Sequence, residues 1–260
     1  MHINKKLRLK LISILSVLIF LSVWELCTGV LKIIPPTSLP SPIKVCSTLI
    51  EKFSVSAPDG STLGVHIIAS LQVSLLGFFL GCVIGIPLGI LMAWYRKFDL
   101  LAKPVFDFLR TIPPIAWIPI MIIFLGIGVL AEASIVFLSA FIPCVINSYS
   151  GIKATNMVHI WTAQTFGASR FRILLKVAIP TALPFIFTGM KVSLNAAWTS
   201  LLAAEMLGSS KGLGFMIQMG RLLIRSDIVV VGMIIIGIIG FILSTLIDLL
   251  EARFVKGGIQ

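Results

Sequence analysis

The feature that most constrains this chain is a series of apolar stretches, each long enough to cross a lipid bilayer. A helix that crosses ~30 Å of hydrocarbon needs about 20 apolar residues, and windows of this kind recur along the whole 260-residue sequence. The composition agrees, because 58% of the residues are hydrophobic and only 12% are charged, too few to cover a water-soluble domain. Helices satisfy their own backbone polar groups in lipid. The sequence therefore predicts an all-α, polytopic membrane protein.

Six of these stretches are expected to be transmembrane helices, with both chain termini in the cytoplasm. Of the 21 Lys and Arg residues, thirteen lie on the side assigned to the cytoplasm, six lie on the other side, and Arg110 and Lys191 lie within spans. Cytoplasmic loops of membrane proteins carry such an excess. The basic N-terminus resembles a signal peptide, but the apolar run 11–31 is too long for one, which predicts an uncleaved first span. The other expected spans are 67–95, one that starts near Arg110, 133–149, 182–206 and 228–250.

Several classes of function are excluded by what the sequence lacks. The net charge of +11 is concentrated at span ends rather than in a basic patch with interleaved aromatic residues, which argues against nucleic-acid binding. The four cysteines and three histidines are scattered without the spacing of a metal site. The sequence has no GxxxxGK followed by Ser or Thr, so it cannot hold ATP in a loop of that kind. We therefore expect no catalytic residue, no metal and no cofactor.

A stripe of glycines in the second expected span predicts close packing with another helix. Its members recur every four residues and therefore share one face: Gly77, Gly81, Gly85 and Gly89. Small residues at this spacing let a neighbouring helix approach closely in lipid. Helix packing is the favoured interpretation, and a pore lining is the alternative.

The third expected span is broken at its start. Pro113 and Pro114, with a third proline five residues later, remove backbone N–H donors and interrupt the helix. Broken backbone at membrane depth is tolerated only against protein or a water-filled cavity. These two prolines, together with Arg110 and Trp117, are therefore candidates for lining a translocation path. Arg110 is equally well placed to pair with Asp107.

Side chains of the fifth expected span are further candidates for the path or its gate. Charges at membrane depth are costly and usually face a bundle interior or an aqueous cavity. Lys191 either favours an anionic solute or pairs with a group on another helix. Glu205, near the outer end of the span, either contributes to a gate or a partner contact or is an ordinary interfacial carboxylate. Trp198, between them, completes this group of candidates.

Residues 155–180 form a polar, basic segment in an otherwise apolar chain. Ala163 and Gly167 are four residues apart, so on a helix they leave a flat surface against which another protein can pack. Pro180 is expected to mark the return of the chain into the bilayer. Three basic residues precede it, namely Arg170, Arg172 and Lys176. The pattern indicates a docking surface for a soluble partner.

This segment resembles the signature loop of the permease subunits of bacterial ATP-binding-cassette (ABC) importers. In that family Glu-Ala-Ala, three residues and a Gly are followed, after nine residues, by Ile-x-Leu-Pro. Here nine residues separate Gly167 from Val177-Ala178-Ile179-Pro180. Trp161-Thr162-Ala163 stands in place of Glu-Ala-Ala, so the family's Glu is missing and one contact within the loop is in doubt.

The resemblance implies that a separate ATPase docks on residues 155–178. Phe166, Gly167 and Ala168 are then expected at the contact point. Arg170 and Arg172 either supply charge complementarity to the ATPase or anchor the segment at the lipid surface.

Other stretches are similar to the type I permeases of the nitrate, sulfonate and taurine group, and they occur in order along nearly the whole chain. They are Leu39-Pro-Ser-Pro42, Ala69-Ser-Leu71, Arg110-Thr-Ile-Pro-Pro-Ile-Ala-Trp-Ile-Pro119, Gly126-Ile-Gly128, Phe141-Ile-Pro143, Ala203-Ala-Glu205-Met-Leu-Gly208 and Gly212-Leu-Gly214. The resemblance implies the type I ABC importer permease fold, with six transmembrane helices and a cytoplasmic coupling helix. It also implies an N-terminal helix and loop over 1–64, an ABC type-1 transmembrane domain over 65–250 and a tail over 251–260.

The implied function is import of a small solute across a bacterial inner membrane by alternating access. The expected partners are a second permease copy, a pair of ATPase subunits and an extracytoplasmic solute-binding protein. The expected solute is an anion such as a sulfonate, taurine or nitrate, and the alternative is a neutral or cationic solute such as a thiamine-precursor pyrimidine. An ion-coupled secondary transporter would need interrupted spans in two matching halves, and a membrane-embedded enzyme would need a nucleophile with a base or a metal cluster. The sequence favours neither.

Overall fold

The computed structural model describes residues 5–255, and all of its regular elements in that range are helical. Within this range, five helices are long and apolar enough to cross a membrane, and a bent pair raises the number to six if it counts as one span. The prediction of an all-α, multi-span protein is thus confirmed. Residues 1–4 and 256–260, the latter part of the expected tail, lie outside the described residues.

Most expected spans are found, but the helices extend beyond the predicted limits. In chain order the elements are α1 (Lys5–Glu25), a π-helical turn (Leu26–Val30), α2 (Pro42–Lys52), α3 (Leu63–Trp94), α4 (Arg96–Leu109), a 3-10 turn (Pro114–Trp117), α5 (Ile118–Leu125), α6 (Val129–Lys153), α7 (Met157–Thr165), α8 (Arg170–Ile173), a second π-helical turn (Leu174–Ala178), α9 (Ile179–Gly208), α10 (Leu213–Leu222) and α11 (Ser226–Val255). Two segments expected as connections are helices, α4 and α10, because packing and hydrogen bonds from distant residues outweigh their polar and glycine-rich sequences.

The chain divides into two compact units, each considered by itself below. The first unit contains Met1–His66 and Met216–Ile236, and the second contains Ile67–Phe215 and Gly237–Gln260. The helices α3, α10 and α11 contribute residues to both units.

In the first unit, hydrogen bonds hold the segments that follow α1. The Trp24 indole N–H donates to the carbonyl oxygen of Pro40, at 3.0 Å, and Ser41 caps α2 by accepting from the backbone N–H of Lys44. Lys52, at the end of α2, is only 2% exposed. Its ammonium contacts the Asp59 carboxylate and donates to the carbonyl oxygen of Ser61 at 2.8 Å, which fixes the loop between α2 and α3.

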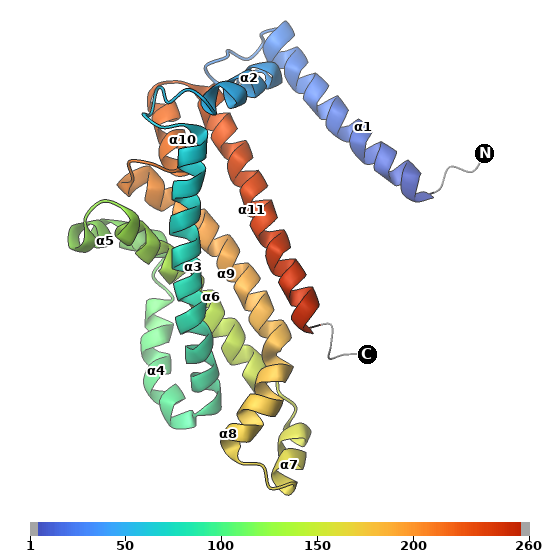
Figure 1. The fold of residues 1–260 in the computed structure, drawn as a ribbon, viewed down its shortest axis with the longest axis vertical. Helices are drawn as coiled ribbons and strands as arrows, with labels where there is room; N and C mark the ends of the chain where they lie inside the picture. The colour runs from blue at the N-terminus through green and yellow to red at the C-terminus, as the bar shows by residue number, and fades with distance from the viewer. Residues whose placement is uncertain (1–4, 256–260) are drawn as a thin grey trace. The chain divides into compact units, whose positions relative to one another are not determined.

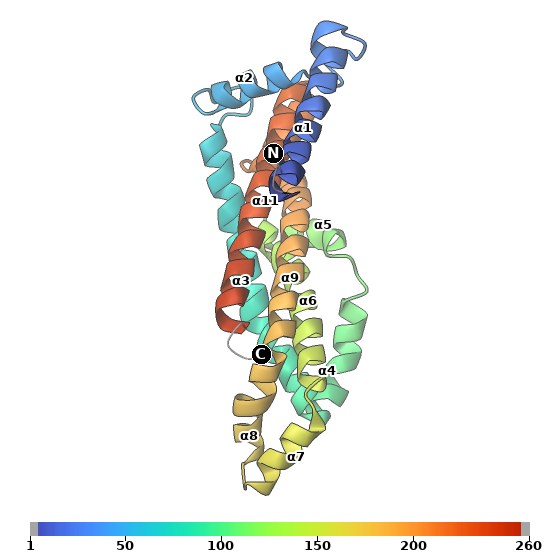
Figure 2. The same cartoon turned by 90° about the vertical axis from the view of Figure 1, so that its right-hand side faces the viewer.

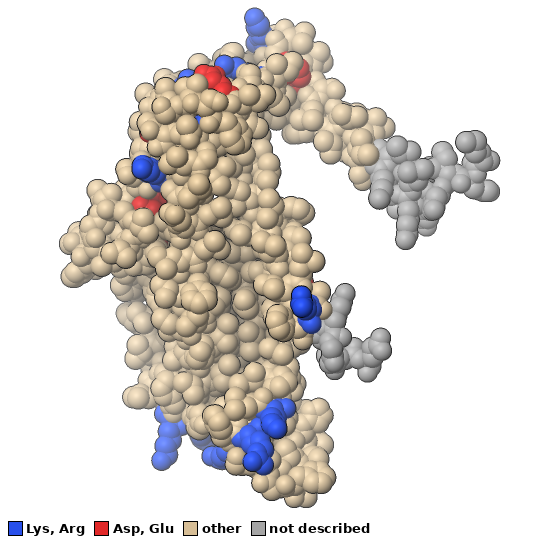
Figure 3. Space-filling view, viewed as in Figure 1, with Lys and Arg blue, Asp and Glu red and all other residues tan. Residues whose placement is uncertain are grey.

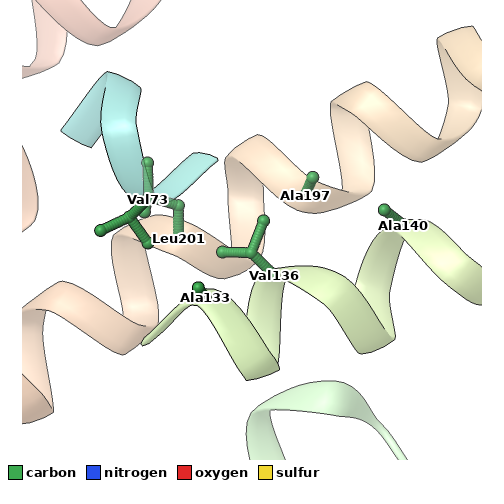
Figure 4. Close-up of a cluster of buried hydrophobic side chains, with 6 residues drawn as sticks. All are labelled: Val73, Ala133, Val136, Ala140, Ala197 and Leu201. Atoms are coloured by element: carbon green, nitrogen blue, oxygen red, sulfur yellow. The ribbon is translucent and has the colours of Figure 1, made fainter. Parts of the chain in front are cut away.

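The core of the second unit is formed where α3, α6 and α9 pack side by side (Figures 1 and 2). One cluster of buried side chains lies between these three helices (Figure 4). Its members are Val73, Ala133, Val136, Ala140, Ala197 and Leu201. Three of the six are alanines, and this choice lets α6 and α9 approach each other closely, as small residues do in lipid.

The glycine stripe of α3 faces α6. A Cβ atom on Gly77 would lie 2.6 Å from the Val136 Cβ atom, and one on Gly81 would lie 2.6 Å from the Ala140 Cβ atom. Both distances are shorter than real Cβ contacts. The other two glycines make similarly close approaches to the same helix, Gly85 to Cys144 and Gly89 to Ser148. Larger side chains at any of these positions would force the two helices apart.

The third span is bent by 82° between α4 and the segment Pro114–Leu125. Pro113 and Pro114 stand at the bend, where the missing donors end α4 and leave only a 3-10 turn before α5. Ile118, the first residue of α5, is buried against Ile135 of α6 and Ala204 of α9. This anchor fixes the direction of α5 within the second unit.

Candidate functional site

The polar segment between α6 and α9 is a helical hairpin with capped ends. α7 starts at Met157, because the side chain of Asn156 accepts a hydrogen bond from the backbone N–H of Val158 at 2.9 Å. α8 starts at Arg170, where the Ser169 hydroxyl accepts from the Arg172 N–H at 3.4 Å. Local hydrogen bonds thus define both helix starts.

The turn between α7 and α8 depends on Gly167. Its φ angle is +74°, a conformation that side-chain-bearing residues rarely adopt. The Gly167 N–H donates to the Gln164 carbonyl at 2.9 Å, and the Ala168 N–H donates to the Ala163 carbonyl at 3.0 Å. This pair of bonds is the Schellman motif that ends helices. Ala163 and Gly167 therefore both take part in the motif that ends α7. Their spacing predicts only that they share a helix face.

The hairpin presents exposed apolar side chains outside any helix bundle. Phe166 is 86% exposed, and no residue of α7 is buried. The other large apolar side chains exposed on the hairpin are Met157, Val158, Trp161 and Phe171. Lys and Arg atoms gather at the end of the second unit that carries α7 and α8 (Figures 1 and 3). An apolar tip with basic surroundings is typical of a protein-docking surface.

The predicted return at Pro180 is not a turn in the structure. Residues Arg170–Gly208 run as one helical span, and the chain reverses earlier, at residues 166–169. Pro180 has no N–H to donate four residues back, and the preceding turn widens into the π-helical segment Leu174–Ala178. Thr181 compensates locally, because its hydroxyl donates to the Val177 carbonyl at 2.7 Å.

The bent span borders a small polar cavity beside Arg110. This cavity, of about 210 Å³, is lined by the polar residues Lys103, Asp107, Arg110, Tyr149 and Ser150 and by apolar neighbours. The Arg110 Nε atom lies 2.9 Å from the Asp107 carboxylate, and both side chains are partly exposed. A guanidinium carries five N–H donors, so one carboxylate contact leaves donors for an anionic group.

The second cation of this cavity, Lys103, lies over the ring of Tyr149. The Lys103 ammonium lies 5.8 Å from the centre of the Tyr149 ring, and that of Lys153 lies 5.5 Å from it, within the range of cation–π attraction. The Tyr149 hydroxyl donates to the Asp99 carboxylate at 3.2 Å. Pro114 and Trp117 line a second cavity of about 210 Å³, which shares Phe106 with the first and has almost entirely apolar walls. Pro113 lines neither cavity.

Lys191 forms ion pairs with α11. Its ammonium lies 2.6 Å from the Asp248 carboxylate and also contacts that of Glu251. Of the two possibilities that the sequence left open, pairing with another helix is the one present in the structure. Trp198, on the same helix, packs against the core cluster of the second unit and lies next to Gly240 of α11.

Glu205 lies inside the second unit rather than at an exposed interface, with 1% of its surface accessible. One carboxylate oxygen accepts from the Ser70 hydroxyl at 2.6 Å, and the other accepts from the backbone N–H of Gly214 at 2.7 Å. The Ser70 oxygen accepts in turn from the N–H of Leu213, at 2.8 Å. Gly212 has φ +120°, and a Cβ atom there would lie 2.5 Å from the Glu205 carboxyl carbon. Glu205 therefore joins α9, α3 and the first turn of α10.

Sequence reasoning missed the partners of these charged side chains. Ser70 belongs to the quoted stretch Ala69-Ser-Leu71, but nothing in its neighbourhood indicates a bond to a carboxylate 135 residues away. Asp248 and Glu251 are three residues apart near the end of the last span, which places them on one helix face. Two carboxylates on one helix face are the one sequence signal that could have indicated a cation partner for them.

The fold and the hairpin can now be compared with known proteins. A family model for the binding-protein-dependent transport system inner membrane component matches residues 85–257. The chain belongs to this family. The taurine transport system permease protein TauC of Escherichia coli (strain K12) is 34% identical over 245 residues, which cover 93% of this chain and 88% of TauC. The nitrate import permease protein NrtB of Synechocystis sp. is 30% identical over 245 residues, which cover 92% and 87% of the two chains.

A solved structure supports the same fold. One chain of the inward-facing MetNI methionine ABC transporter superposes with a TM-score of 0.63 at 21% identity, over 76% of this permease and 96% of that chain. The chain is therefore a membrane-spanning permease of the type I ABC importer family. The resemblance to the nitrate, sulfonate and taurine group is confirmed.

Proposed function

We propose that this permease forms the translocation path for a small anion, such as a sulfonate, taurine or nitrate, in an ABC importer of the bacterial inner membrane. A second permease copy completes the path, and an extracytoplasmic binding protein delivers the solute. Each of two ATPase subunits docks on the α7–α8 hairpin of one permease copy in the cytoplasm. The names of TauC and NrtB support a solute with an anionic group, since taurine carries a sulfonate and nitrate is itself an anion. The Arg110 cavity offers free N–H donors to such a group.

The observation that carries the proposal is the exposed, capped hairpin with Phe166 at its turn. An 86% exposed phenylalanine is costly in water, and a partner pocket that buries it would recover about 1.5–3 kcal/mol. The Schellman turn at Gly167 holds Phe166 in one position, so that less conformational entropy is lost on docking. Because α8 continues into α9 as a single helical span, movement of the docked ATPase would be transmitted to the helix that bears Lys191 and Glu205.

Alternating access then requires that the ATPase bind two permease conformations with different affinity. ATP-driven closure of the ATPase pair would draw the two hairpins of a permease dimer together. Arg170 and Arg172 follow the contact point directly, and both are exposed, which suits them to acidic groups on the ATPase. This step uses residues of the hairpin alone and needs no cofactor in the permease.

The test is solute-stimulated ATP hydrolysis in a reconstituted complex of permease, ATPase and binding protein. Phe166→Ala should reduce the stimulation at least about tenfold, because the main anchor of the contact is lost. Phe241→Ala is the matched control, since Phe241 is also a largely exposed phenylalanine, on α11. Full stimulation with Phe166→Ala, at equal permease abundance, would reject the docking assignment.

A further inference from the structure

A basic cleft in the first unit is not used by the transport function proposed above. It measures about 450 Å³, and its lining includes the cations Lys32, Lys44 and Arg225 and the carboxylate Asp227. Asp227 is already bonded, to Arg225 at 2.8 and 2.9 Å and to the Thr48 hydroxyl at 2.9 Å. Hydrogen bonds to Asp227 raise the pKa of Arg225 above its ordinary value, so the guanidinium keeps its charge. A second carboxylate, Glu25, lies beside the lining residues Gly29 and Ser41. Three cations against two carboxylates leave the cleft with an excess of one positive charge.

The cations of the cleft lie where helices leave the hydrocarbon. Lys32 follows the first apolar span, which ends at Val30, by two residues, and Arg225 directly precedes the span that starts at Ser226. Basic side chains at span ends lie at the level of lipid head groups and attract anionic ones. In the described part of the chain, neither Lys32 nor Lys44 has a carboxylate partner. Both ammonium groups are thus available to an external anion.

The backbone is strained around this cleft. Lys32 has φ 51° and Ile224 has φ 56°, and they are the two non-glycine residues with positive φ among the described residues. Both line the cleft. Such conformations are strained for residues with side chains and tend to occur at binding sites. The strain points to a cleft whose shape serves a ligand.

An apolar groove adjoins the cleft and shares Thr28 with it. It measures about 520 Å³. Its walls come from one face of α1 and its π-helical turn, and from the first turns of α11; they include Phe20, Val23, Cys27, Val230, Met233 and Ile234. From Phe20 to Thr28 the helix rises about 12 Å. Small residues such as the glycines between α3 and α6 let two helices approach closely, and the groove has large side chains instead. It therefore suits a thin, flexible chain better than a closely packed helix.

Trp24 marks the boundary between the cleft and the groove. Its ring lines the groove, and its N–H donates to the Pro40 carbonyl at the polar end. Tryptophan takes this position at the membrane–water interface. Thr28 is 3% exposed and donates its hydroxyl to the Trp24 carbonyl at 2.8 Å, so the shared wall has a fixed position. The two hollows are thus polar and apolar parts of one continuous surface.

We propose that the first unit binds one phospholipid with an anionic head group. The phosphate lies in the basic cleft between Lys32, Lys44 and Arg225, and an acyl chain lies in the groove between α1 and α11. The positive charge of the cleft matches the phosphate, its position at the span ends matches the level of the head groups, and the adjoining apolar groove matches an acyl chain. The site requires membrane insertion but does not depend on the transported solute.

The test uses the full-length permease in nanodiscs that contain phosphatidylglycerol with a photoreactive diazirine on one acyl chain. After illumination, mass spectrometry should find the label in the peptides that contain Phe20–Cys27 and Val230–Ile234. The double variant Lys32→Gln, Lys44→Gln should lower this labelling about tenfold or more, since two of the three cations that attract the phosphate are removed. Lys211→Gln, Arg221→Gln is the matched control, because both residues are exposed and assigned to the same side, and it should label normally.

Two outcomes would overturn the proposal. The first is equal labelling of these peptides by diazirine-bearing phosphatidylcholine and phosphatidylglycerol, with no change in the variant that lacks Lys32 and Lys44. Such labelling would come from non-specific lipid around the protein. The second is capture of another permease chain by a photoreactive amino acid placed at position 233, which would assign the groove to a contact between two copies. A phosphatidylglycerol preference that depends on the two lysines supports the site.

Discussion

Glu205 shows how a single residue holds three helices of this permease together. Replacing it with alanine would leave the Ser70 hydroxyl and the Gly214 N–H without their acceptors in a buried position. Each lost acceptor costs about 1–3 kcal/mol. We therefore predict that Glu205→Ala lowers the melting temperature of the purified permease by several degrees, measured by thermal unfolding in detergent.

Two further variants make the Glu205 prediction specific. Glu205→Gln keeps one carbonyl oxygen as an acceptor and should have an intermediate melting temperature. Glu51→Ala, which removes an exposed carboxylate, should leave it unchanged. If Glu205→Ala melted like the unaltered protein, the hydrogen bonds to Ser70 and Gly214 would contribute nothing to stability.

The sequence identified several of these residues but not the reasons for their importance. Gly167 stands out by its position in the signature loop, yet its conformation is set by the helix end that Ala163 and Gln164 complete. Glu205 stands out as a charge in an apolar span. Its environment depends on Ser70, far away in the chain, and a periodicity argument carries no information on such long-range pairs.

At the level of elements, the ion pairs of Lys191 link α9 to α11. We predict that Lys191→Met alone reduces both stability and solute uptake, because two carboxylates, Asp248 and Glu251, are left without their cation. The triple variant Lys191→Met, Asp248→Asn, Glu251→Gln removes all three charges together. It should recover most of the uptake, measured with radiolabelled solute in proteoliposomes at equal permease content.

The triple variant separates the two roles that the sequence allowed for Lys191. A protein that regains its thermal stability but still fails to transport would show that the ammonium acts on the solute itself. In that case the contacts with α11 would be secondary. Recovery of both properties would assign Lys191 to helix pairing.

The elements that the sequence predicted well are those with a strong apolar signal. α6, α9 and α11 each contain the expected span and extend past it at both ends, because a helix does not end where the hydrocarbon ends. α3 begins four residues before its expected span and ends one residue short of it, at Trp94. α10 was missed because its sequence is rich in glycine, and its first N–H groups are satisfied by Ser70 and Glu205. The basic residues at the start of α4 predict a loop, but the helix forms because its Phe106 side is buried against α3 and α6.

For the whole molecule, apolar windows and one signature loop were enough to predict an all-α, type I importer permease. The bend of the third span was also anticipated, because prolines act locally. The division into two units was not, since Met216–Ile236 group with the N-terminal residues through contacts such as that of Thr48 with Asp227. Contacts between segments so distant in sequence arise only in the folded chain.

Orientation in the membrane is the property of the whole molecule on which the proposed function depends, and two cysteine positions test it. Cys46 is exposed on α2, which the count of basic residues assigns to the outside, and Thr165 is exposed at the end of α7. In a Cys27→Ala background, a membrane-impermeant maleimide should label Cys46 in intact spheroplasts. With Cys46→Ala and Thr165→Cys, labelling should require permeabilisation, because the proposed function places the hairpin in the ATP-containing compartment.

The buried Cys82 and Cys144 serve as internal controls for this experiment. Both are at most 8% exposed, so they should remain unlabelled until the protein is denatured. Labelling of Thr165→Cys from outside an intact cell would place the hairpin away from ATP, and an ATPase could not dock there. The excess of Lys and Arg at that end would then need another cause, because the potential and the anionic lipids of the cytoplasmic face favour basic loops on the inside.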